Sequence, residues 1–188
     1  MLQGREIIVG VSGGIAAYKA AALTSALVQQ GAAVTAVMTP GARRFIGTAT
    51  FAALTGRPVA TRIFASRRHP LGAHIELSSK ADGIVVAPAS ADLLAKAAAG
   101  MADDLLTTLL LCAECPVWMA PAMNSAMWAK AAVQRNVAQL ADDGVTIIQP
   151  GSGWLSCRQS GAGRMAEPAD ILTTLTAAFA CRPDSPAP

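Results

Sequence analysis

The sequence predicts an α/β fold: a three-layer sandwich around a Rossmann-like (flavodoxin-like) parallel sheet. Short β-rich runs alternate along the chain with alanine-rich stretches of helical character, a pattern typical of a sheet covered by helices on both faces. The β-rich runs are apolar at almost every position, as expected of parallel strands buried on both faces. Segments rich in Gly, Pro, Ser or Asn follow four of these runs, at the strand ends where such sheets bind ligands.

Five runs are predicted to be strands, because each is dominated by Val, Ile and other apolar residues. A Ser-Gly-Gly sequence at 12–14 ends the first run, Pro88 ends the third and Pro121 ends the fourth, since Gly and Pro interrupt regular structure. The predicted strands are 6–11, 33–38, 83–87, 116–120 and 145–149.

Five stretches between and after the strands are predicted to be helices. Gly31 and Gly144 are placed to stop two of them, because glycine accepts the left-handed conformation that ends a helix. We expect residues 1–181 to form a single domain and residues 182–188 (RPDSPAP) to be a disordered tail. The predicted helices are 15–30, 91–99, 103–112, 130–142 and 169–179.

The composition limits the possible partners. Of 188 residues, 53% are hydrophobic and only 14% are charged, which argues against disorder and favours an oligomer that hides part of the surface. The net charge of +3 is too small to indicate nucleic-acid binding. A cluster of arginines is interpreted either as a solvated loop or as a patch that attracts an anionic substrate; its members are Arg57, Arg62, Arg67 and Arg68.

No segment is convincing as a membrane span. The most apolar stretch, 105–123, is interrupted by Glu114 and two prolines, whereas a span requires an uninterrupted apolar run. The N-terminus carries charges and no cleavable apolar core. We therefore expect a cytoplasmic protein that has no contact with a membrane.

The chain has four cysteines, and we expect reduced thiols because no secretory signal is apparent. Cys112 and Cys115 have CxxC spacing, but a metal site would need a second pair of ligands. The histidines, His69 and His74, lack the partner spacing to supply it. We predict no metal and interpret the CxxC pair as core packing.

Two of the strand-end segments favour phosphate and polar ligands. Gly13, Gly14 and Ile15 open a helix after the first strand, and free N–H groups at such a turn attract a phosphate. The spacing is neither GxGxxG nor a Walker loop, and a tight turn without a ligand stays an alternative. Ser90 and Asp92 follow the third strand, where they fit a ligand platform, a helix cap or both.

Three further side chains are candidates for chemistry. Asn124, after the fourth strand, has donors that suit a carboxylate, although an isolated Asn is more often a cap or turn residue. His74 is a lone histidine, which is usually structural. Cys157 lies in a long Gly-rich segment, 154–165, that lacks a core pattern and is typical of a binding flap.

Several motifs together resemble one family. The chain resembles the homo-oligomeric flavin-containing cysteine decarboxylases, and among them most closely the phosphopantothenoylcysteine decarboxylases of coenzyme A biosynthesis, from about residue 5 to residue 179. Each motif is weak alone, but six in the right order are specific. They are SGGIAAYK (12–19), HIEL (74–77), PASAD (88–92), GMADDLL (100–106), PAMNSAMW (121–128) and CRQSGAGRMAEP (157–168).

The resemblance implies FMN as cofactor, with its phosphate at the first strand–helix turn. It also implies a homotrimer or homododecamer, because the flavin of this family lies at the contacts of a trimer. Where the family usually has Asn-Thr, this chain has Asp92 and Leu93, and a carboxylate cannot donate as an amide does. The residues that the resemblance implies as FMN contacts are Gly13, Gly14, Ile15, Thr39, Ser90, Ala91 and Asp92.

The implied reaction is FMN-dependent decarboxylation of 4'-phosphopantothenoylcysteine to 4'-phosphopantetheine. Oxidation of the substrate thiol to a thioaldehyde creates an electron sink, loss of carbon dioxide gives an enethiolate, and the reduced flavin then returns the electrons. His74 matches the family's essential histidine beside the flavin, Asn124 binds the carboxylate, and Cys157 protonates the enethiolate. Met127 matches a substrate-site residue, and a substrate clamp is formed by Gly163, Arg164 and Met165.

Other members of this broad group are alternatives. A peptidyl-cysteine decarboxylase of a ribosomal peptide pathway would stop at the enethiol and would lack the flap cysteine. A non-catalytic FMN-binding regulatory homologue would usually carry acidic extensions. A flavin prenyltransferase would share the sheet and FMN but not the PAMN motif or Cys157.

Overall fold

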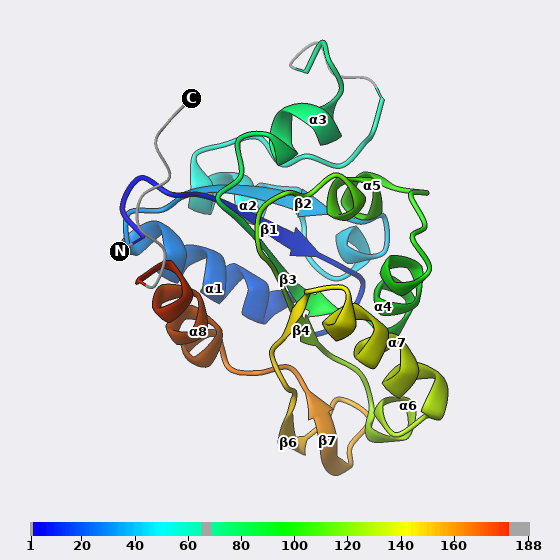
Figure 1. Ribbon diagram of the computed structural model, residues 1–188. Helices are drawn as coiled ribbons and strands as arrows, with labels where there is room; N and C mark the ends of the chain where they lie inside the picture. Colours follow the sequence, from blue (N-terminus) through cyan, green and yellow to red (C-terminus); the bar gives the residue numbers. More distant parts are fainter. Residues whose placement is uncertain (1, 65–68, 181–188) are drawn as a thin grey trace.

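The computed structural model describes residues 2–64 and 69–180 (Figure 1). The tail predicted at 182–188 lies outside the described residues, as do Arg67 and Arg68 of the arginine cluster. Within the described part, no helix has the length and apolar character needed to cross a bilayer.

The centre of the molecule is a five-stranded sheet in which every pair of neighbouring strands is parallel. The strand order is β2-β1-β3-β4-β5, which is the flavodoxin-like order. This confirms the predicted fold class. The strands are β1 (Glu6–Val11), β2 (Ala33–Met38), β3 (Gly83–Ala89), β4 (Val117–Pro121) and β5 (Thr146–Ile147).

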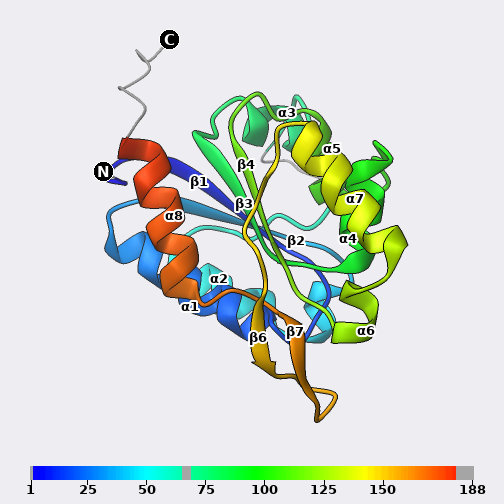
Figure 2. The same cartoon turned by 60° about the horizontal axis from the view of Figure 1, so that its bottom comes forward.

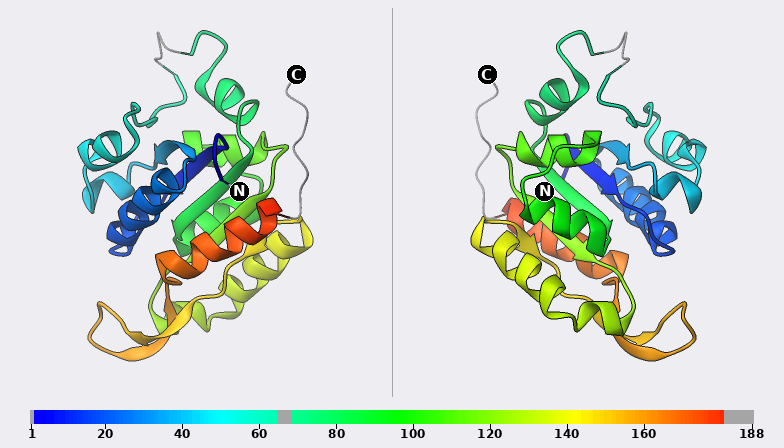
Figure 3. Two further views of the ribbon diagram at one scale, coloured as in Figure 1. Left: turned by 90° about the vertical axis from the view of Figure 1, so that its left-hand side faces the viewer. Right: turned by 90° about the vertical axis from the view of Figure 1, so that its right-hand side faces the viewer.

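Helices cover both faces of the sheet (Figures 2 and 3). On one face lie α1 (Ala17–Gln29), α2 (Thr48–Thr55) and α8 (Pro168–Ala180). The other face is covered by α3 (Ala73–Ser78), α4 (Ala91–Ala98), α5 (Leu105–Leu111) and α7 (Ala131–Asp142). The predicted helices are therefore present, although α2, α3 and the short α6 (Ser125–Trp128) were not expected from the sequence.

The core has two halves, one on each side of the sheet. Val9 and Val85 pack into the half under α1 and α8, whereas Ile8 and Val86 pack into the half under α4, α5 and α7. Successive side chains of a strand point to opposite faces, so these strands must be apolar at nearly every position. The observation confirms that β1 to β4 are buried on both sides, whereas β5, with Thr146 exposed, departs from the prediction.

Three strand ends differ from the prediction, and the smallest difference is that β4 includes Pro121, which was expected to end it. β3 continues through Pro88 to Ala89, and its register with β4 shifts between Val86 and Ala89. A proline is tolerated at such an irregularity because no regular ladder bond is required there, so the expectation that Pro88 ends the strand was wrong. β5 has only two residues, Thr146 and Ile147, although the apolar run predicted five.

One edge of the sheet is short, and the other is partly covered. β5 forms one edge with its two residues. Beside β2, on the other edge, the backbone N–H of Ala60 donates to the carbonyl of Ala36 (2.9 Å), and the N–H of Met38 donates to the carbonyl of Ala60 (3.0 Å).

The Gly-rich segment that was predicted to be a flap forms a hairpin outside the main sheet. Its strands, β6 (Gly151–Trp154) and β7 (Ser160–Arg164), pair antiparallel and project from the molecule between β5 and α8 (Figures 1 and 2).

The interpretation of both CxxC cysteines as core residues was wrong for one of them. Cys112 is exposed at the C-terminal cap of α5, whereas Cys115 is partly buried against the core.

Candidate active site

Two adjoining pockets lie at the carboxyl ends of the parallel strands, where open α/β sheets bind ligands. The first, which we call the strand-end pocket, has a volume of about 870 Å³ and lies beyond the ends of β1, β2 and β3. It is lined by Ser12, Gly13, Thr39, Pro40, Gly41, Arg43, Arg44, Phe45, Ser90, Ala91, Asp92, Leu93, Lys96, Asp103, Asp104 and Met127.

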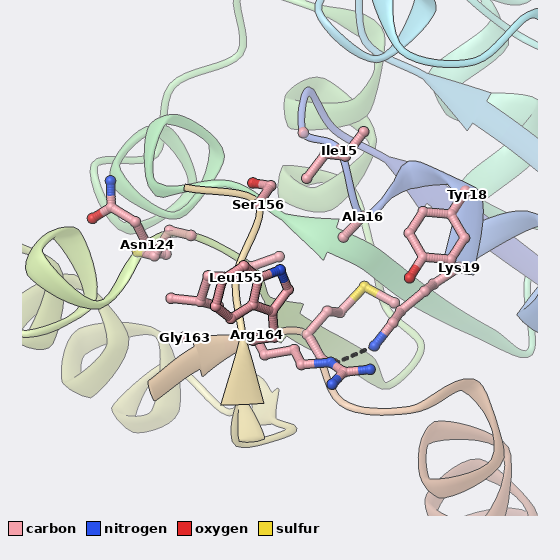
Figure 4. A pocket seen from close by; sticks show the side chains of 14 residues that line it. Ile15, Ala16, Tyr18, Lys19, Asn124, Leu155, Ser156, Gly163 and Arg164 are labelled. Atoms are coloured by element: carbon pink, nitrogen blue, oxygen red, sulfur yellow. Dashed lines mark hydrogen bonds between the residues drawn. The ribbon is translucent and has the colours of Figure 1, made fainter. Parts of the chain in front are cut away.

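The second pocket, which we call the hairpin pocket, has a volume of about 420 Å³. It lies between the turn that follows β1, the loop after β4 and the β6–β7 hairpin (Figure 4). It is lined by Gly14, Ile15, Ala16, Tyr18, Lys19, Ala122, Met123, Asn124, Trp154, Leu155, Ser156, Gly163, Arg164 and Met165. The two pockets meet at the Gly13–Gly14 turn, because Gly13 lines one and Gly14 the other.

Ser12 joins the two loops that form the floor of the strand-end pocket. Its buried hydroxyl donates to the carbonyl of Pro88 (2.8 Å) and accepts from the backbone N–H of Ser90 (2.8 Å). Both hydrogen-bonding functions of the hydroxyl are thus used between β1 and β3, so the buried hydroxyl avoids the cost of an unsatisfied polar group. Sequence reasoning did not name Ser12 as a site residue, although a Ser directly after an apolar strand was visible.

The turn after β1, which lines the strand-end pocket, favours glycine at position 13. A Cβ added at Gly13 would lie 3.1 Å from the carbonyl carbon of Gly41, so the loops after β1 and β2 approach backbone to backbone. Thr39 shapes the second loop, because its Oγ1 accepts from the N–H of Ala42 (3.2 Å). This close approach fits the prediction that a phosphate contacts backbone here.

Ser90 caps α4, because its Oγ accepts from the N–H of Leu93 (3.3 Å). The cap alternative is confirmed. Ser90, Ala91 and Asp92 also line the strand-end pocket, and the platform alternative stays a prediction. The helix N-terminus therefore faces the pocket with its positive end.

Asn124 is the N-cap of α6. Its Oδ1 accepts from the N–H of Met127 (2.8 Å), so the amide NH2 is the part of the side chain suited to donate to a ligand. Asn124 lines the hairpin pocket, but Met127 lines the strand-end pocket. The two residues that were expected to share the substrate site therefore line different pockets.

The predicted cofactor residues are divided in the same way. Five of the seven line the strand-end pocket, whereas Gly14 and Ile15 line the hairpin pocket. The five are Gly13, Thr39, Ser90, Ala91 and Asp92.

The hairpin is Gly-rich because it docks closely on the loop after β4. Met123 donates its N–H to the carbonyl of Gly163 (3.0 Å). A Cβ at Gly163, whose φ is +110°, would lie 2.5 Å from the carbonyl oxygen of Met123, and one at Gly161 would lie 2.9 Å from the Cβ of Ser125. Larger residues would push the hairpin away from the pocket. The predicted clamp residues Gly163, Arg164 and Met165 do line the hairpin pocket.

A buried lysine holds the chain just after β7, at the base of the hairpin. Lys19 of α1, which lines the hairpin pocket (Figure 4), is only 5% exposed. Its Nζ donates to the carbonyl of Met165 (3.0 Å) and to Oε1 of Glu167 (2.8 Å). Nη2 of Arg164 contacts the same Glu167 oxygen (2.9 Å). The hydrogen bond from Lys19 keeps the pKa of Glu167 below its ordinary value, with smaller effects from the Lys19 and Arg164 charges. Sequence reasoning missed Lys19, which is far from these partners along the chain.

His74 and Cys157 line neither pocket. Cys157 is exposed in the turn of the hairpin. His74 lies on α3, at the opposite end of the molecule from the hairpin (Figures 1 and 3). Its Nδ1 is buried and has no hydrogen-bond partner among the described residues. A single copy of the chain therefore does not bring these two residues together with Asn124.

Other charged groups have structural partners. Arg57 of the arginine cluster contacts Glu6 (2.6 Å), and this hydrogen bond raises the pKa of Arg57. Within residues 2–64 and 69–180, no group of three His, Cys, Asp or Glu side chains is arranged to hold a metal ion.

One curated relative matches nearly the whole chain. The coenzyme A biosynthesis bifunctional protein CoaBC of Bacillus subtilis (strain 168) is 46% identical over 186 residues, which are 99% of this chain and 46% of that protein. The chain therefore spans less than half the length of this curated relative.

Solved structures share the fold. A cysteine-to-serine mutant of PPC decarboxylase, complexed with pantothenoylaminoethenethiol, has a TM-score of 0.84 and 30% identity, covering 95% of this chain and all of that one. The FMN-dependent cysteine decarboxylase SpaF has a TM-score of 0.83 and 36% identity, covering 96% of this chain and all of that one.

A family model described as Flavoprotein matches residues 1–180. Because this match extends over almost the entire chain and agrees with the fold and the curated relative, the chain belongs to the Flavoprotein family.

Proposed function

We propose that this chain catalyses the FMN-dependent decarboxylation of 4'-phosphopantothenoylcysteine to 4'-phosphopantetheine in coenzyme A biosynthesis. The observation that carries the proposal is the pair of adjoining pockets that meet at the Gly13–Gly14 turn. We infer that the strand-end pocket holds a phosphorylated cofactor. The hairpin pocket has the amide of Asn124 and the β6–β7 hairpin as a cover for a substrate. The name of the curated relative and that of the PPC decarboxylase structure support the same activity.

The residues of the strand-end pocket fit FMN. The close approach of Gly13 and Gly41 brings the loops after β1 and β2 together at the pocket wall, and the capped N-terminus of α4 faces the same space. Arg43 and Arg44 add positive charge. This donor set suits a phosphate. When bound, FMN would supply the reversible two-electron oxidation of the substrate thiol.

The residues of the hairpin pocket position the cysteine end of the substrate. The NH2 of Asn124 donates to the carboxylate that is lost as carbon dioxide, because its Oδ1 is held by the cap of α6. Arg164, oriented by Glu167, adds positive charge at the other side of the pocket. Cys157 reaches the substrate only when the hairpin turn folds over the pocket, and its thiol then protonates the enethiolate.

We propose a homotrimer, or a dodecamer made of such trimers, in which a second copy supplies His74. The distance of α3 from both pockets within one copy supports this arrangement. Two exposed apolar side chains also support a contact between copies. One is Phe45 at the strand-end pocket, and the other is Ile75, next to His74 on α3.

Complementation tests the shared site. His74→Asn and Asn124→Asp are each expected to be inactive, but co-expression of the two variants would produce mixed assemblies in which some sites have both native residues. Activity should then rise well above that of either variant. Mixed assemblies, verified by differently tagged subunits, that stay inactive would contradict the shared site, and so would an active monomer in light scattering.

A direct assay tests the activity. Purified yellow protein incubated with 4'-phosphopantothenoylcysteine should release carbon dioxide and form 4'-phosphopantetheine, detected by mass spectrometry. A protein that binds FMN but converts neither this substrate nor a peptide would support the non-catalytic, regulatory alternative.

A peptidyl-cysteine decarboxylase is the second candidate, favoured by the similarity to the cysteine decarboxylase SpaF. Cys157 separates the two. A serine hydroxyl is nearly isosteric with the thiol but a much weaker acid, so Cys157→Ser should oxidise and decarboxylate the substrate and then stall. Its product would be an enethiol, lighter by two hydrogen atoms. A native protein that released enethiol, and only from peptides ending in cysteine, would instead identify the peptide enzyme.

We also propose a cytoplasmic location, because the thiols are expected to be reduced and coenzyme A biosynthesis needs soluble intermediates. Fractionation of cells that express a tagged chain would test it.

A further inference from the structure

The strand-end pocket contains carboxylates where a phosphate is proposed to bind. Asp92, Asp103 and Asp104 line it together with Lys96 and the two arginines of the loop after β2. Uncompensated carboxylates within a few ångströms of a phosphate would repel it. The arrangement of these groups therefore decides whether the pocket accepts a phosphorylated ligand.

Lys96 links two of the three carboxylates. Its Nζ lies 2.9 Å from Oδ2 of Asp103 and 3.4 Å from Oδ2 of Asp92, one helical turn earlier on α4. The hydrogen bond with Asp103 raises the pKa of Lys96 and lowers that of Asp103, so both are charged near neutral pH. Lys96 is largely buried, but the Asp92 side chain is 76% exposed.

The third carboxylate is occupied by the protein itself. Oδ1 of Asp104 accepts from the N–H of Thr107 (2.9 Å) as part of the capping box of α5. Thr107 also contacts Asp103 through its hydroxyl (3.4 Å). Asp104 is therefore stabilised as a helix cap, and the pair that depends on Lys96 is Asp92 and Asp103.

We propose that Lys96 determines the specificity of this pocket for a phosphorylated flavin, by neutralising Asp92 and Asp103 so that a phosphate dianion can approach. The inference deepens the proposed function and rests on FMN as the ligand of this pocket. It also gives a physical account of Asp92, which stands where the flavin-containing cysteine decarboxylases usually have an uncharged Asn. The added negative charge of Asp92 is matched by Lys96, one helical turn away.

Removal of the cation should affect a phosphorylated ligand selectively. With Lys96→Met the pocket keeps both carboxylates but loses their partner, so FMN is repelled, whereas riboflavin, which has no phosphate, is not. In an Asp92→Asn background the same change leaves one fewer carboxylate, so its effect should be smaller. This is a double-mutant cycle, and it measures the coupling of Asp92 and Lys96.

The test is a competition between two flavins. Purified holoprotein is equilibrated with equal concentrations of FMN and riboflavin, and the bound flavins are released by denaturation and quantified by chromatography. Lys96→Met should lower the ratio of bound FMN to bound riboflavin by about tenfold or more, a change of about 1.4 kcal/mol. Asp92→Asn/Lys96→Met should recover part of that ratio, because Asp103 still lacks its partner. Lys130→Met, an exposed lysine that lines neither pocket, is the matched control.

The outcomes are distinct. If Lys96 merely supported α4, Lys96→Met would weaken both flavins equally, and an unchanged ratio would overturn the inference. A double variant with the same low ratio as Lys96→Met would overturn the role of Asp92. A native protein that took up riboflavin and FMN without preference would also refute it, whereas a native protein that bound neither flavin would refute the proposed function itself.

Discussion

The strand-end pocket and the hairpin pocket adjoin, but they are built in different ways. The strand-end pocket is framed by the ends of three buried strands, and the hydroxyl of Ser12 connects two of its loops. The hairpin pocket is closed on one side by β6 and β7, which belong to a separate two-stranded sheet. The hairpin is attached through backbone contacts at Gly163 and through Lys19.

The difference separates two tasks. A site formed by strand ends is held by the same packing that stabilises the core, which suits a ligand that stays bound. A two-stranded hairpin is only marginally stable by itself, and covers of this kind open and close with turnover. Substitutions in the two pockets should therefore have separable effects on cofactor binding and on turnover.

The largest expected effect is at Asn124. Asn124→Asp keeps an oxygen that caps α6, because Asp is as good an N-cap as Asn, but under the proposed function it would place a negative charge against the substrate carboxylate. Turnover should fall by about a hundredfold or more, as when a catalytic hydrogen-bond donor is removed, while the flavin absorbance of the purified protein is unchanged. Product formation and absorbance measure the two quantities; near-native turnover would remove Asn124 from the site.

Gly13→Ala should produce the opposite pattern. The new methyl would lie 3.1 Å from the backbone of Gly41, and overpacking of this kind costs about 1–3 kcal/mol. The affinity for FMN should fall by about tenfold, with little change in turnover per bound flavin. At Gly14 the nearest atom to an added Cβ is 4.0 Å away, so Gly14→Ala should weaken FMN less. Equal losses at the two positions would contradict the close-approach argument.

Gly163→Ala tests the attachment of the hairpin. Its φ of +110° and the 2.5 Å approach to the Met123 carbonyl both oppose a side chain, so the hairpin should shift away from the pocket. The KM for substrate should rise by about tenfold, whereas FMN content should be retained. Gly151→Ala is the matched control, because Gly151 is in the same hairpin and an added Cβ there meets nothing within 4 Å. A similar KM for both variants would contradict the prediction.

The smallest effect concerns acid stability. The pKa of Glu167 is lowered from its ordinary value of 4.5, chiefly by the hydrogen bond from Lys19. A lowered pKa in the folded state means that the stabilisation is complete above pH 4.5 and is lost as the pH falls through the folded pKa. The Glu167 side chain is half exposed, so the effect should be small. Below pH 4.5, the Tm of Glu167→Gln should therefore fall less steeply with decreasing pH than the Tm of the native protein. The same slope for both proteins would contradict this prediction.

Most of the sheet could be predicted because β1 to β4 are buried on both faces, and α1 and α7 could be predicted with their ends because Gly31 and Gly144 follow them. The continuous apolar runs that form β1 and β3 follow directly from that burial. The hairpin could not be predicted as strands, because Gly151–Trp154 and Ser160–Arg164 have no alternation of apolar and polar residues. The glycines there reflect docking on the loop after β4, which is a tertiary contact.

The candidate site was predictable in part for the same reason. Gly13 and Ser90 follow strand ends, and their place at the carboxyl edge follows from the parallel sheet. Lys19 was missed because its partners Met165 and Glu167 are distant in sequence. The position of Met127 was also not predictable, because the turn of α6 decides which pocket each of its side chains lines.

The edges of the sheet limit how copies of this chain can join. A long unpaired edge strand acts as a template on which another chain adds by main-chain hydrogen bonds. One edge here is β5, with two residues, and the other is blocked where Ala60 bonds with Ala36 and Met38. In the proposed assembly we therefore expect the sheet to end within each copy, so that copies would join through the side chains of helices and loops.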